Sequence, residues 1–501
     1  MHPLAQLDRR FVWHPFTQMK DWCRTEPIVI VEGRGAVLVD ARGRTYLDAN
    51  ASIWTNLHGH RHPRINAAIR RQLGRVSHSS SLGLANEPAS RLAAELVNVA
   101  NPPRKISGKS VNARTMASLG PGGRLEKVFY SDDGSTAVEV ALKLAWEYTR
   151  RTRGDSAPRF LSMAGAYHGD TVGAVSLGHI DLFHRAFGKL LFKTDAMMAP
   201  YCYRCPFNRA RPERADARAY RECHWECVTE VEKMWDRRGR RGPGYAAVVF
   251  EPKMQGAAGM IPQPLGWLER IAGLSRSRGA LLIADEVMTG FGRTGTGTGT
   301  GTGSEAGVEP GVGAPLFASF HEGVVPDFLC VAKGLTGGYL PMAATLTTRA
   351  VFEAFLGEYG EFRTFFHGHS YNGNQLGAAA ALASLELLRD PAGVRRRQRL
   401  ERALAEELKG LWDLPAVGDI RQEGLVAGVE LVRDWRTRAP FPVVERVGIR
   451  VCEAMARRGI LTRPIGNVIV LMPPYCMTAA QIRRVVSGLA ESLGEVVGGG
   501  A

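Results

Sequence analysis

The stretch "ALLIADEVMTGFGRTG", residues 280–295, is the part of the sequence that best indicates the fold. Its first five residues are apolar without alternation, which is typical of a strand buried on both faces of a sheet. Two carboxylates, Asp285 and Glu286, follow the apolar run, and a glycine-rich segment comes next. Ligands of α/β proteins bind beyond the carboxyl ends of parallel strands, so this carboxylate pair is predicted to lie at a ligand site.

Similar apolar runs occur on both sides of this stretch, and segments with a helical pattern separate them. The runs are residues 127–131, 246–252 and 327–334. Continuous apolar strands alternating with helices predict an α/β protein with a mostly parallel sheet. Beyond about residue 380, longer helices alternate with shorter strands such as 424–431 and 467–474, which predicts a smaller α+β domain.

These patterns divide the chain into three parts and mark three insertions. The parts are an N-terminal segment (1–85), a large domain (86–380) and a small C-terminal domain (381–501), and the insertions are 105–124, 202–227 and 294–316. The third insertion contains a Gly-Thr repeat, whose low complexity predicts a flexible loop because it cannot bury a core.

The chain is basic, with a formal net charge of +15 over 501 residues. A basic protein that binds nucleic acid or metal, without being an enzyme, is therefore one interpretation. The arginines are scattered, however, and no nucleic-acid-binding motif is present, which favours a solvated basic surface. No apolar run reaches the length of about 18 residues that a membrane span needs, and the N-terminus does not resemble a secretory signal. A cytoplasmic protein is expected.

Half of the eight cysteines lie within the second insertion. They are Cys202, Cys205, Cys223 and Cys227. Their C-x2-C and C-x3-C spacing is compatible with a structural zinc site, and the alternative is a set of reduced thiols in a surface insertion. A catalytic metal is not implied.

The segment after the strand at 127–131 is a candidate anion site. A helix is predicted to begin near Gly134 and Ser135, and the free backbone N–H groups at a helix start can hold a phosphate. An ordinary helix cap is the alternative, because serine and threonine are favoured there.

Asp285 and Lys333 each follow an apolar run. An ionised Asp285 beside a buried strand requires a cationic partner, such as a protonated pyridine nitrogen, although a helix cap or an ion pair with Arg293 is also possible. A buried Lys333 should have a lowered pKa and serve as a nucleophile, unless its side chain extends to solvent. A phosphate site, a carboxylate and a lysine at strand ends are together what pyridoxal 5'-phosphate requires.

At this point the sequence resembles the class III pyridoxal-phosphate-dependent aminotransferases. The stretches that carry the resemblance are the opening one together with residues 131–145, 165–177, 251–260, 332–348, 365–382 and 461–475. It extends over most of the chain and implies the type I fold of these transferases. "VWHPFTQMKDW" (12–22) and "RPIGNVIVLMPPY" (463–475) resemble the members that aminate 8-amino-7-oxononanoate to 7,8-diaminononanoate in biotin synthesis. Another ω-aminotransferase of class III is the alternative.

The resemblance also implies a role for individual residues. Lys333 would hold the cofactor and move the proton, Asp285 would keep the pyridine nitrogen protonated, and Gly134 with Ser135 would bind the phosphate. Tyr167 and Val287 would lie on the two faces of the ring. His369 and Ser370 would reach the phosphate of the neighbouring subunit, which implies a homodimer. The residues expected at the substrate are Trp54, Tyr167, Lys333, Gly368, Arg463 and Phe16, with Arg463 pairing the carboxylate of the oxononanoate.

The amino donor is left open between S-adenosylmethionine and lysine. Members that use S-adenosylmethionine carry a tyrosine and paired tryptophans at positions where this sequence has Phe16 and Ile53. The stretches "HPFTQMKD" and "HGHSYNGNQLG" are more similar to the members that use lysine.

Overall fold

The computed structural model describes residues 1–101, 105–106, 109–110, 123–155, 157–239, 244–295 and 315–498. Most of the insertion at 105–124 lies outside the described residues, apart from the paired strands β4 (Lys105–Ile106) and β5 (Lys109–Ser110). The Gly-Thr repeat, predicted to be a flexible loop, also lies outside them.

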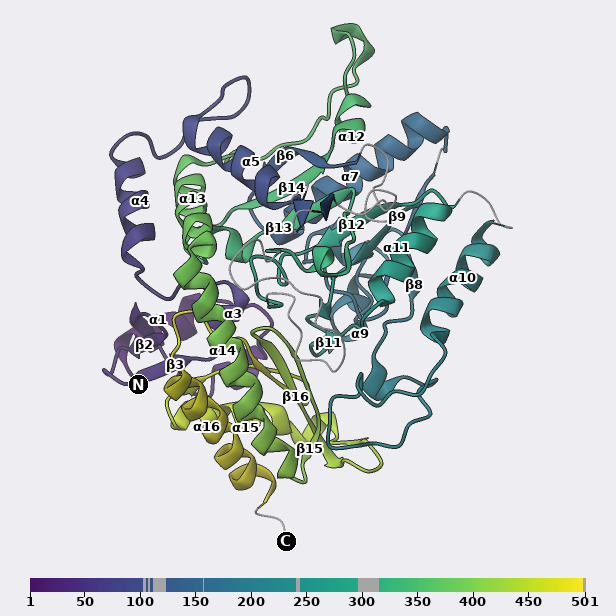
Figure 1. The fold of residues 1–501 in the computed structure, drawn as a ribbon. Helices are drawn as coiled ribbons and strands as arrows, with labels where there is room; N and C mark the ends of the chain where they lie inside the picture. The colour runs from purple at the N-terminus through teal and green to yellow at the C-terminus, as the bar shows by residue number, and fades with distance from the viewer. Residues whose placement is uncertain are drawn as a thin grey trace.

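A seven-stranded sheet forms the centre of the molecule (Figure 1). Its strands, in spatial order, are β6 (Leu125–Ser131), β14 (Ala343–Thr348), β13 (Phe328–Val331), β12 (Leu281–Asp285), β9 (Tyr245–Phe250), β7 (Arg159–Met163) and β8 (Asp195–Met197). The five strands from β13 to β8 are parallel neighbours, and β14 is antiparallel to both β13 and β6. The prediction of a mostly parallel sheet is therefore confirmed, as are the four strands predicted from the apolar runs.

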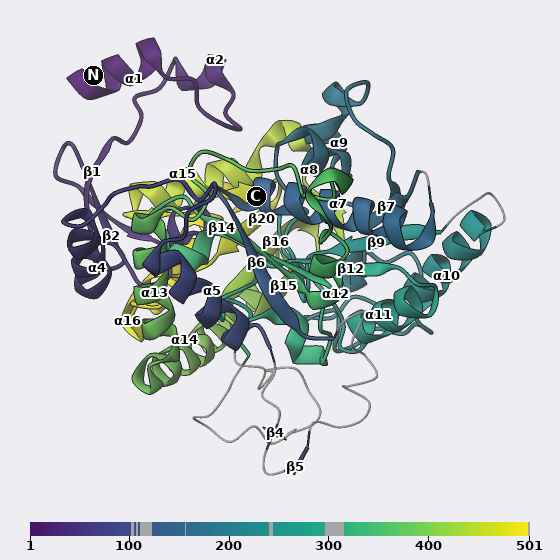
Figure 2. The same ribbon diagram turned by 90° about the horizontal axis from the view of Figure 1, so that it is seen from above.

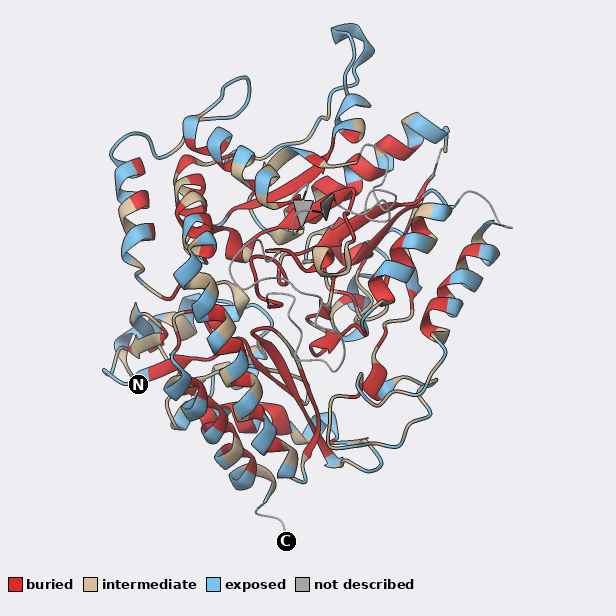
Figure 3. Cartoon of the chain, viewed as in Figure 1, coloured by how far each residue is buried: buried red, intermediate tan, exposed pale blue. Residues whose placement is uncertain are grey.

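Both faces of this sheet are buried, which explains why its strands are continuously apolar. On β12, Leu281 and Ile283 pack toward helix α7 (Gly134–Arg153), whereas Leu282 and Ala284 face the opposite core. Side chains of a strand alternate between faces, so a strand covered on both sides has no polar positions. Figure 3 shows the result as a buried central layer with exposed residues on the outer surfaces of the helices.

The C-terminal part of the chain forms a smaller antiparallel sheet. Its strands are β15 (Val417–Glu423), β16 (Val426–Asp434), β20 (Val468–Leu471) and β19 (Pro464–Ile465), with β17 (Ala439–Pro440) paired to β16. The helices of this part are α14 (Pro391–Lys409), α15 (Val447–Arg457) and α16 (Ala479–Val497). Helix α13 (Gln375–Arg389) leads into it from the large sheet and packs on α4 (Pro63–Leu73) and α5 (Glu87–Val99).

The N-terminal segment joins the C-terminal part through a shared sheet. Strands β1 (Ile30–Arg34), β2 (Val37–Asp40) and β3 (Thr45–Asp48) are antiparallel, and β18 (Ile460–Leu461) runs parallel to β3. Helices α1 (Pro3–Phe11) and α2 (Met19–Trp22) lie to one side of the remaining structure (Figure 2). The domain boundaries near residues 85 and 380 stay predictions.

The other helices of the described residues are shorter or cover the edges of the large sheet. They are α3 (Ala51–Trp54), α8 (Val172–Ser176), α9 (Asp181–His184), α10 (Glu226–Gly239), α11 (Trp267–Ser277) and α12 (Arg349–Glu353). Among the described residues, no helix combines the length and the apolar character needed to cross a bilayer.

The insertion at 202–227 is docked onto the small sheet through a buried ionic network. Arg421 on β15 is fully buried, and its guanidinium donates to Asp419 Oδ2 at 2.8 Å and to Glu430 Oε2 at 2.7 Å. The same guanidinium donates from Nε to the carbonyl oxygen of Met260 at 2.7 Å. Arg204, within the insertion, and Tyr201, directly before it, bind Glu430 as well. The guanidinium thus connects the small sheet with the backbone at Met260, and Glu430 connects the guanidinium with Arg204 of the insertion.

Removing Arg421 should destabilise the fold strongly, because the buried carboxylate of Asp419 would lose its ion-pair partner and Glu430 would keep only Arg204. We expect Arg421→Ala to lower the free energy of unfolding by about 3–5 kcal/mol, measured by denaturant titration. Arg433→Ala serves as the matched control, because it removes an exposed ion pair with Glu445 and should cost at most about 1 kcal/mol. Equal effects of the two substitutions would contradict this account of the network.

Candidate active site

A cavity of about 740 Å³ opens at the carboxyl edge of the large sheet. Five sheet strands bring residues to it: β6 ends before Asp132, β7 before the loop with Tyr167, β9 before Glu251, β12 at Asp285 and β13 before Lys333. Parallel strands end at the same edge, so residues far apart in the sequence meet there. The prediction of a ligand site after these strands agrees with this arrangement.

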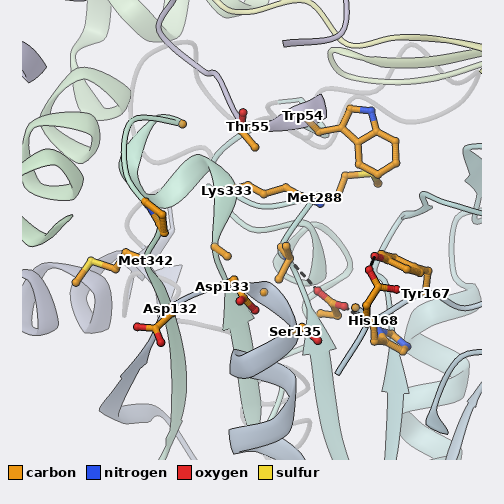
Figure 4. A pocket seen from close by; sticks show the side chains of 18 of the residues that line it. Trp54, Thr55, Asp132, Asp133, Ser135, Tyr167, His168, Met288, Lys333 and Met342 are labelled. Atoms are coloured by element: carbon orange, nitrogen blue, oxygen red, sulfur yellow. Dashed lines mark hydrogen bonds and ion pairs between the residues drawn. The ribbon is translucent and has the colours of Figure 1, made fainter. Parts of the chain in front are cut away.

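Lys333 lies on the wall of the cavity, two residues after β13 (Figure 4). Removal of the ammonium from water lowers its pKa, as does the charge of Arg293, while Asp285 and Glu251 oppose the shift. Its Nζ lies 5.0 Å from the centre of the Trp54 ring, so the side chain remains within the cavity and does not extend to solvent. A lysine with a lowered pKa has a neutral amine available nearer to neutral pH.

Asp285 is paired with a histidine that the sequence analysis did not identify. His168 Nδ1 lies 2.7 Å from Asp285 Oδ2, and both side chains are buried. Burial by itself would lower the pKa of His168, but the hydrogen bond and the charge of Asp285 outweigh it and the pKa is raised. The ion pair with Arg293 considered above is wrong, because Arg293 donates to the carbonyl oxygens of Asn56 and Pro473.

The start of α7 forms a tight backbone cradle. Asp133 caps the helix and accepts from the Thr136 N–H at 2.9 Å. A Cβ added to Gly134 would lie 2.6 Å from Val287 Cγ1, so only glycine fits there. Ser135 Oγ lies 2.7 Å from Thr171 Oγ1. The free backbone N–H groups at the start of the helix can donate to an anionic group in the cavity, and the small side chains leave room for it.

Trp54 reaches the cavity from a strained turn. Residues 51–54 have φ values of 46°, 49°, 59° and 68°, one after another in the left-handed region. This conformation costs about 1–2 kcal/mol per residue. Asp48 holds the turn by accepting from the backbone N–H and the hydroxyl of Ser52, at 2.9 and 2.7 Å. Such strain is typical of a residue whose position matters at a site.

Seven of the predicted site residues line this cavity. They are Trp54, Gly134, Ser135, Tyr167, Asp285, Val287 and Lys333. Tyr167 and Trp54 are therefore not core aromatics, although the Tyr167 hydroxyl also donates to Asp170 Oδ2 at 2.7 Å.

The remaining predicted residues lie outside the lining of this cavity. Phe16 lies near it, with its ring centre 6.3 Å from that of Tyr167. His369 lies 2.9 Å from Asp132, while Gly368 and Ser370 are exposed on the same loop. Arg463 is exposed and precedes β19, whose Ile465 packs in one apolar cluster with Trp54.

His168 and Glu251 are the main residues that the sequence analysis missed. Both are buried at the cavity, and both stand in stretches that were already quoted for other reasons. His168 directly follows Tyr167, and Glu251 ends the apolar run 246–250 just as Asp285 ends its own. A carboxylate after a buried strand was therefore a sufficient signal for Glu251.

The structural zinc site that the spacing of the four cysteines allows stays a prediction. Within the described residues, which include all of 202–227, no group of three or more metal-ligating side chains is placed to hold an ion. All four are free thiols, and Cys202 and Cys227 are buried. Cys223 Sγ accepts from Arg221 Nη1 at 3.0 Å.

Three comparisons with known proteins point to the same family. The sequence model of the family "Aminotransferase class-III" matches residues 19–493. An adenosylmethionine-8-amino-7-oxononanoate aminotransferase of Geobacter sulfurreducens is 46% identical over 99% of this chain and 98% of that protein. One of Nitratidesulfovibrio vulgaris is 47% identical over 96% of this chain and 80% of that protein.

Solved structures agree with the sequence relatives. The crystal structure of the Methanocaldococcus jannaschii protein of the same name has a TM-score of 0.83 at 37% identity, and 99% of each chain is covered. An (S)-enantioselective ω-transaminase from Thermomicrobium roseum has a TM-score of 0.82 at 30% identity, covering 99% of this chain and 98% of that one.

The lowered pKa of Lys333 can be measured directly. After reductive methylation with 13C-formaldehyde, we expect the NMR signal of Lys333 to titrate at lower pH than the ordinary lysine value of 10.5, because burial disfavours the ammonium. Signals are assigned by their loss in Lys333→Arg. A midpoint at or above 10.5 would show that the nearby carboxylates outweigh burial.

Proposed function

This chain belongs to the class III aminotransferases, and we propose that it transfers an amino group to 8-amino-7-oxononanoate, forming 7,8-diaminononanoate. The observation that carries the proposal is a lysine with a lowered pKa at a cavity that also holds Asp285 and a helix start. Relatives named for this reaction match the chain over nearly its full length. The place of the reaction in biotin synthesis, and the cytoplasm as its compartment, belong to the proposal.

Pyridoxal 5'-phosphate fits the residues present at the cavity. Gly134, Ser135 and Thr171 would hold its phosphate, because the cradle is closed to a Cβ and is lined by hydroxyl and N–H groups. Asp285 would hold its ring nitrogen, and Lys333 would bind its aldehyde carbon. When bound, the cofactor supplies an electron sink for the bond that breaks at the amine-bearing carbon.

The residues of this chain provide the proton transfers. Lys333 is the group that takes and returns the proton, because burial lowers the pKa of its amine. Asp285 contributes a fixed negative charge, which His168 orients through the 2.7 Å contact to Oδ2. A negative charge at this position favours a protonated ring nitrogen. An arginine in place of Lys333 would remain protonated and would be useless as a base.

We further propose that the substrate chain lies along the wall formed by Trp54, Tyr167 and Met288. Arg463 is proposed to pair with the acceptor carboxylate, since its guanidinium is exposed and no ion pair engages it in the described part of the chain. Phe16 and Gly368 are proposed to close the substrate side.

The amino donor remains a choice between S-adenosylmethionine and lysine. S-adenosylmethionine fits the name of the relatives, whereas the presence of Phe16 and Ile53 favours lysine.

A homodimer with a shared site is also proposed. Apolar side chains lie exposed on the loop after α12 and on the loop before α5, among them Phe366 at 75% and Leu82 at 91%. Exposed apolar surface of this extent is typical of an interface. His369 and Ser370 lie on the first of these loops. In the proposed dimer, these two residues of each subunit would reach the phosphate site of the other subunit.

Another ω-aminotransferase activity is the second candidate, because an ω-transaminase of known structure shares this fold at 30% identity.

The two candidate functions are distinguished by testing whether 7,8-diaminononanoate reacts with the bound cofactor. We expect 7,8-diaminononanoate to convert the aldehyde form of the bound cofactor into its amine form, seen as a change in the absorbance spectrum. Lysine and S-adenosylmethionine, tested separately on fresh enzyme, identify the donor. An aldehyde spectrum that the diamine leaves unchanged would refute the substrate.

Lys333→Ala should abolish turnover, because no other residue of the described cavity lining carries an amine. The expected loss is at least about 10²-fold, the lower range for removing a general acid–base. Lys253→Ala is the control and should leave turnover largely intact, because Lys253 is paired with Glu423 and does not line the cavity. Near-normal turnover of Lys333→Ala would refute the mechanism.

The dimer is tested by sedimentation velocity and by subunit complementation. We expect a species of twice the chain mass, and partial recovery of activity when Lys333→Ala and Ser370→Trp subunits are mixed. Recovery is expected because one of the two composite sites would then have both residues intact. A monomer with full activity would contradict the shared site.

A further inference from the structure

Arg293 is a buried cation that the mechanism above does not use. Its side chain is 1% exposed, and no ion pair engages it in the described part of the chain. Its Nη1 donates to the carbonyl oxygen of Pro473 and its Nη2 to that of Asn56, each at 2.9 Å. Its Nε is buried and has no hydrogen-bond partner among the described residues. A buried charge without an ion-pair partner is costly, so its presence requires an explanation.

The two carbonyl groups belong to parts of the chain that are far apart in the sequence. Asn56 directly follows the strained turn and Thr55, whereas Pro473 follows β20 of the small sheet. Arg293 itself belongs to the glycine-rich segment after β12 of the large sheet. The ring of Tyr475 lies beside the guanidinium, with its centre 5.0 Å from the guanidinium carbon. Arg293 therefore joins the N-terminal segment, the large sheet and the small sheet at one point.

The segment 55–57 packs directly against η4 (Lys333–Thr336), the short turn that begins with the lysine. A Cβ added to Gly334 would lie 3.0 Å from Leu57 Cδ1, and one added to Gly338 would lie 2.7 Å from the carbonyl carbon of Thr55. No side chain fits between the two segments, so the position of one determines that of the other.

Both sides of this contact have strained backbones. Lys333 has a φ of 43°, in the left-handed region that residues other than glycine rarely adopt. Residues 51–54 lie in the same region. Such conformations persist only where the surrounding contacts determine them. The two strained turns bring Lys333 Nζ to 5.0 Å from the centre of the Trp54 ring, and Arg293 binds the segment between that ring and the large sheet.

We propose, resting on the function proposed above, that Arg293 is a positioning residue that holds segment 55–57 against the Lys333 turn. It thereby fixes the amine of Lys333 and the ring of Trp54 relative to each other. A planar guanidinium suits this task, because its separate N–H groups donate to two carbonyl groups at once. Burial is the main cause of the lowered pKa of Lys333, and the charge of Arg293 acts in the same direction.

The test follows Trp54 by 19F NMR in the full-length, cofactor-free chain labelled with 5-fluorotryptophan. The chain has nine tryptophans, and the Trp54 signal is assigned by its loss in Trp54→Phe. In Arg293→Met, which keeps a long side chain without a donor, we expect this signal to shift or broaden, because segment 55–57 loses its anchor. Arg293→Lys keeps the charge and one donor group, so it should give a smaller change.

Arg397→Met is the matched control. Arg397 is also a buried arginine, 5% exposed, and its guanidinium carbon lies 5.4 Å from the centre of the same Tyr475 ring. It donates to the carbonyl oxygen of Leu388 on α13, far from segment 55–57 in the sequence. Its replacement should therefore leave the Trp54 signal in place.

A second readout reports on the amine itself. With the methylation experiment described above, Arg293→Met should move the Lys333 titration to higher pH, because a nearby positive charge is gone. Arg293→Lys should leave its midpoint close to that of the unchanged protein. On active enzyme, Arg293→Met should lower kcat on the order of 10²-fold with a smaller change in KM, since a displaced catalytic group slows the chemical step.

An unchanged Trp54 signal in folded Arg293→Met would overturn the proposal, as would an equal change in Arg397→Met or an unchanged Lys333 titration. If Arg293→Met does not fold, Arg293→Lys decides, and an unchanged Trp54 signal in that variant would overturn the proposal. Both NMR readouts need neither substrate nor cofactor. A chain without aminotransferase activity would therefore refute the proposed function, while this inference is judged by the signals of Trp54 and Lys333.

Discussion

A lysine and an aspartate are held at one edge of a parallel sheet without forming an ion pair with each other. Asp285 is engaged by His168, and Lys333 lies near the ring of Trp54. If the two had paired, each would have stabilised the charged form of the other, and the amine would have stayed protonated. Keeping them apart leaves the lysine with a lowered pKa and the carboxylate free to hold a cationic ring nitrogen. The two residues are positioned by neighbouring strands, Asp285 at the end of β12 and Lys333 two residues after β13.

The surrounding fold makes such a separation possible because it is stiff. The sheet is covered on both faces, so its strand ends have little freedom, and the buried guanidinium of Arg421 connects the small sheet to the backbone of Met260, in the segment between β9 and β12. The left-handed turn at 51–54 is held by Asp48, which in turn contacts His60 at 3.1 Å. Strain of this kind persists only where the neighbouring contacts determine the conformation.

Much of the fold and of the cavity could be predicted from local sequence patterns. Apolar runs that end in Asp285 or just before Lys333 identify both the strands and the edge where they meet. Glu251 could have been found by the same rule, although it precedes a proline and reads as the start of a loop. His168 lies five residues after β7 and has no distinguishing pattern of its own. The spacing of the four cysteines is compatible with structural zinc and with reduced thiols, and spacing alone does not distinguish the two. Ser370, Gly368 and Arg463 lie on loops or next to a short strand, and no local pattern determines where such segments lie.

The central claim is that the amine of Lys333 holds pyridoxal 5'-phosphate. Reduction of the loaded enzyme with borohydride, followed by peptide mass analysis, tests it most directly, because reduction makes the attachment permanent. The account predicts a pyridoxyl-phosphate mass increase on the peptide that contains Lys333 and on no other lysine. A label on a different lysine, or a protein that takes up no label after incubation with the cofactor, would contradict it.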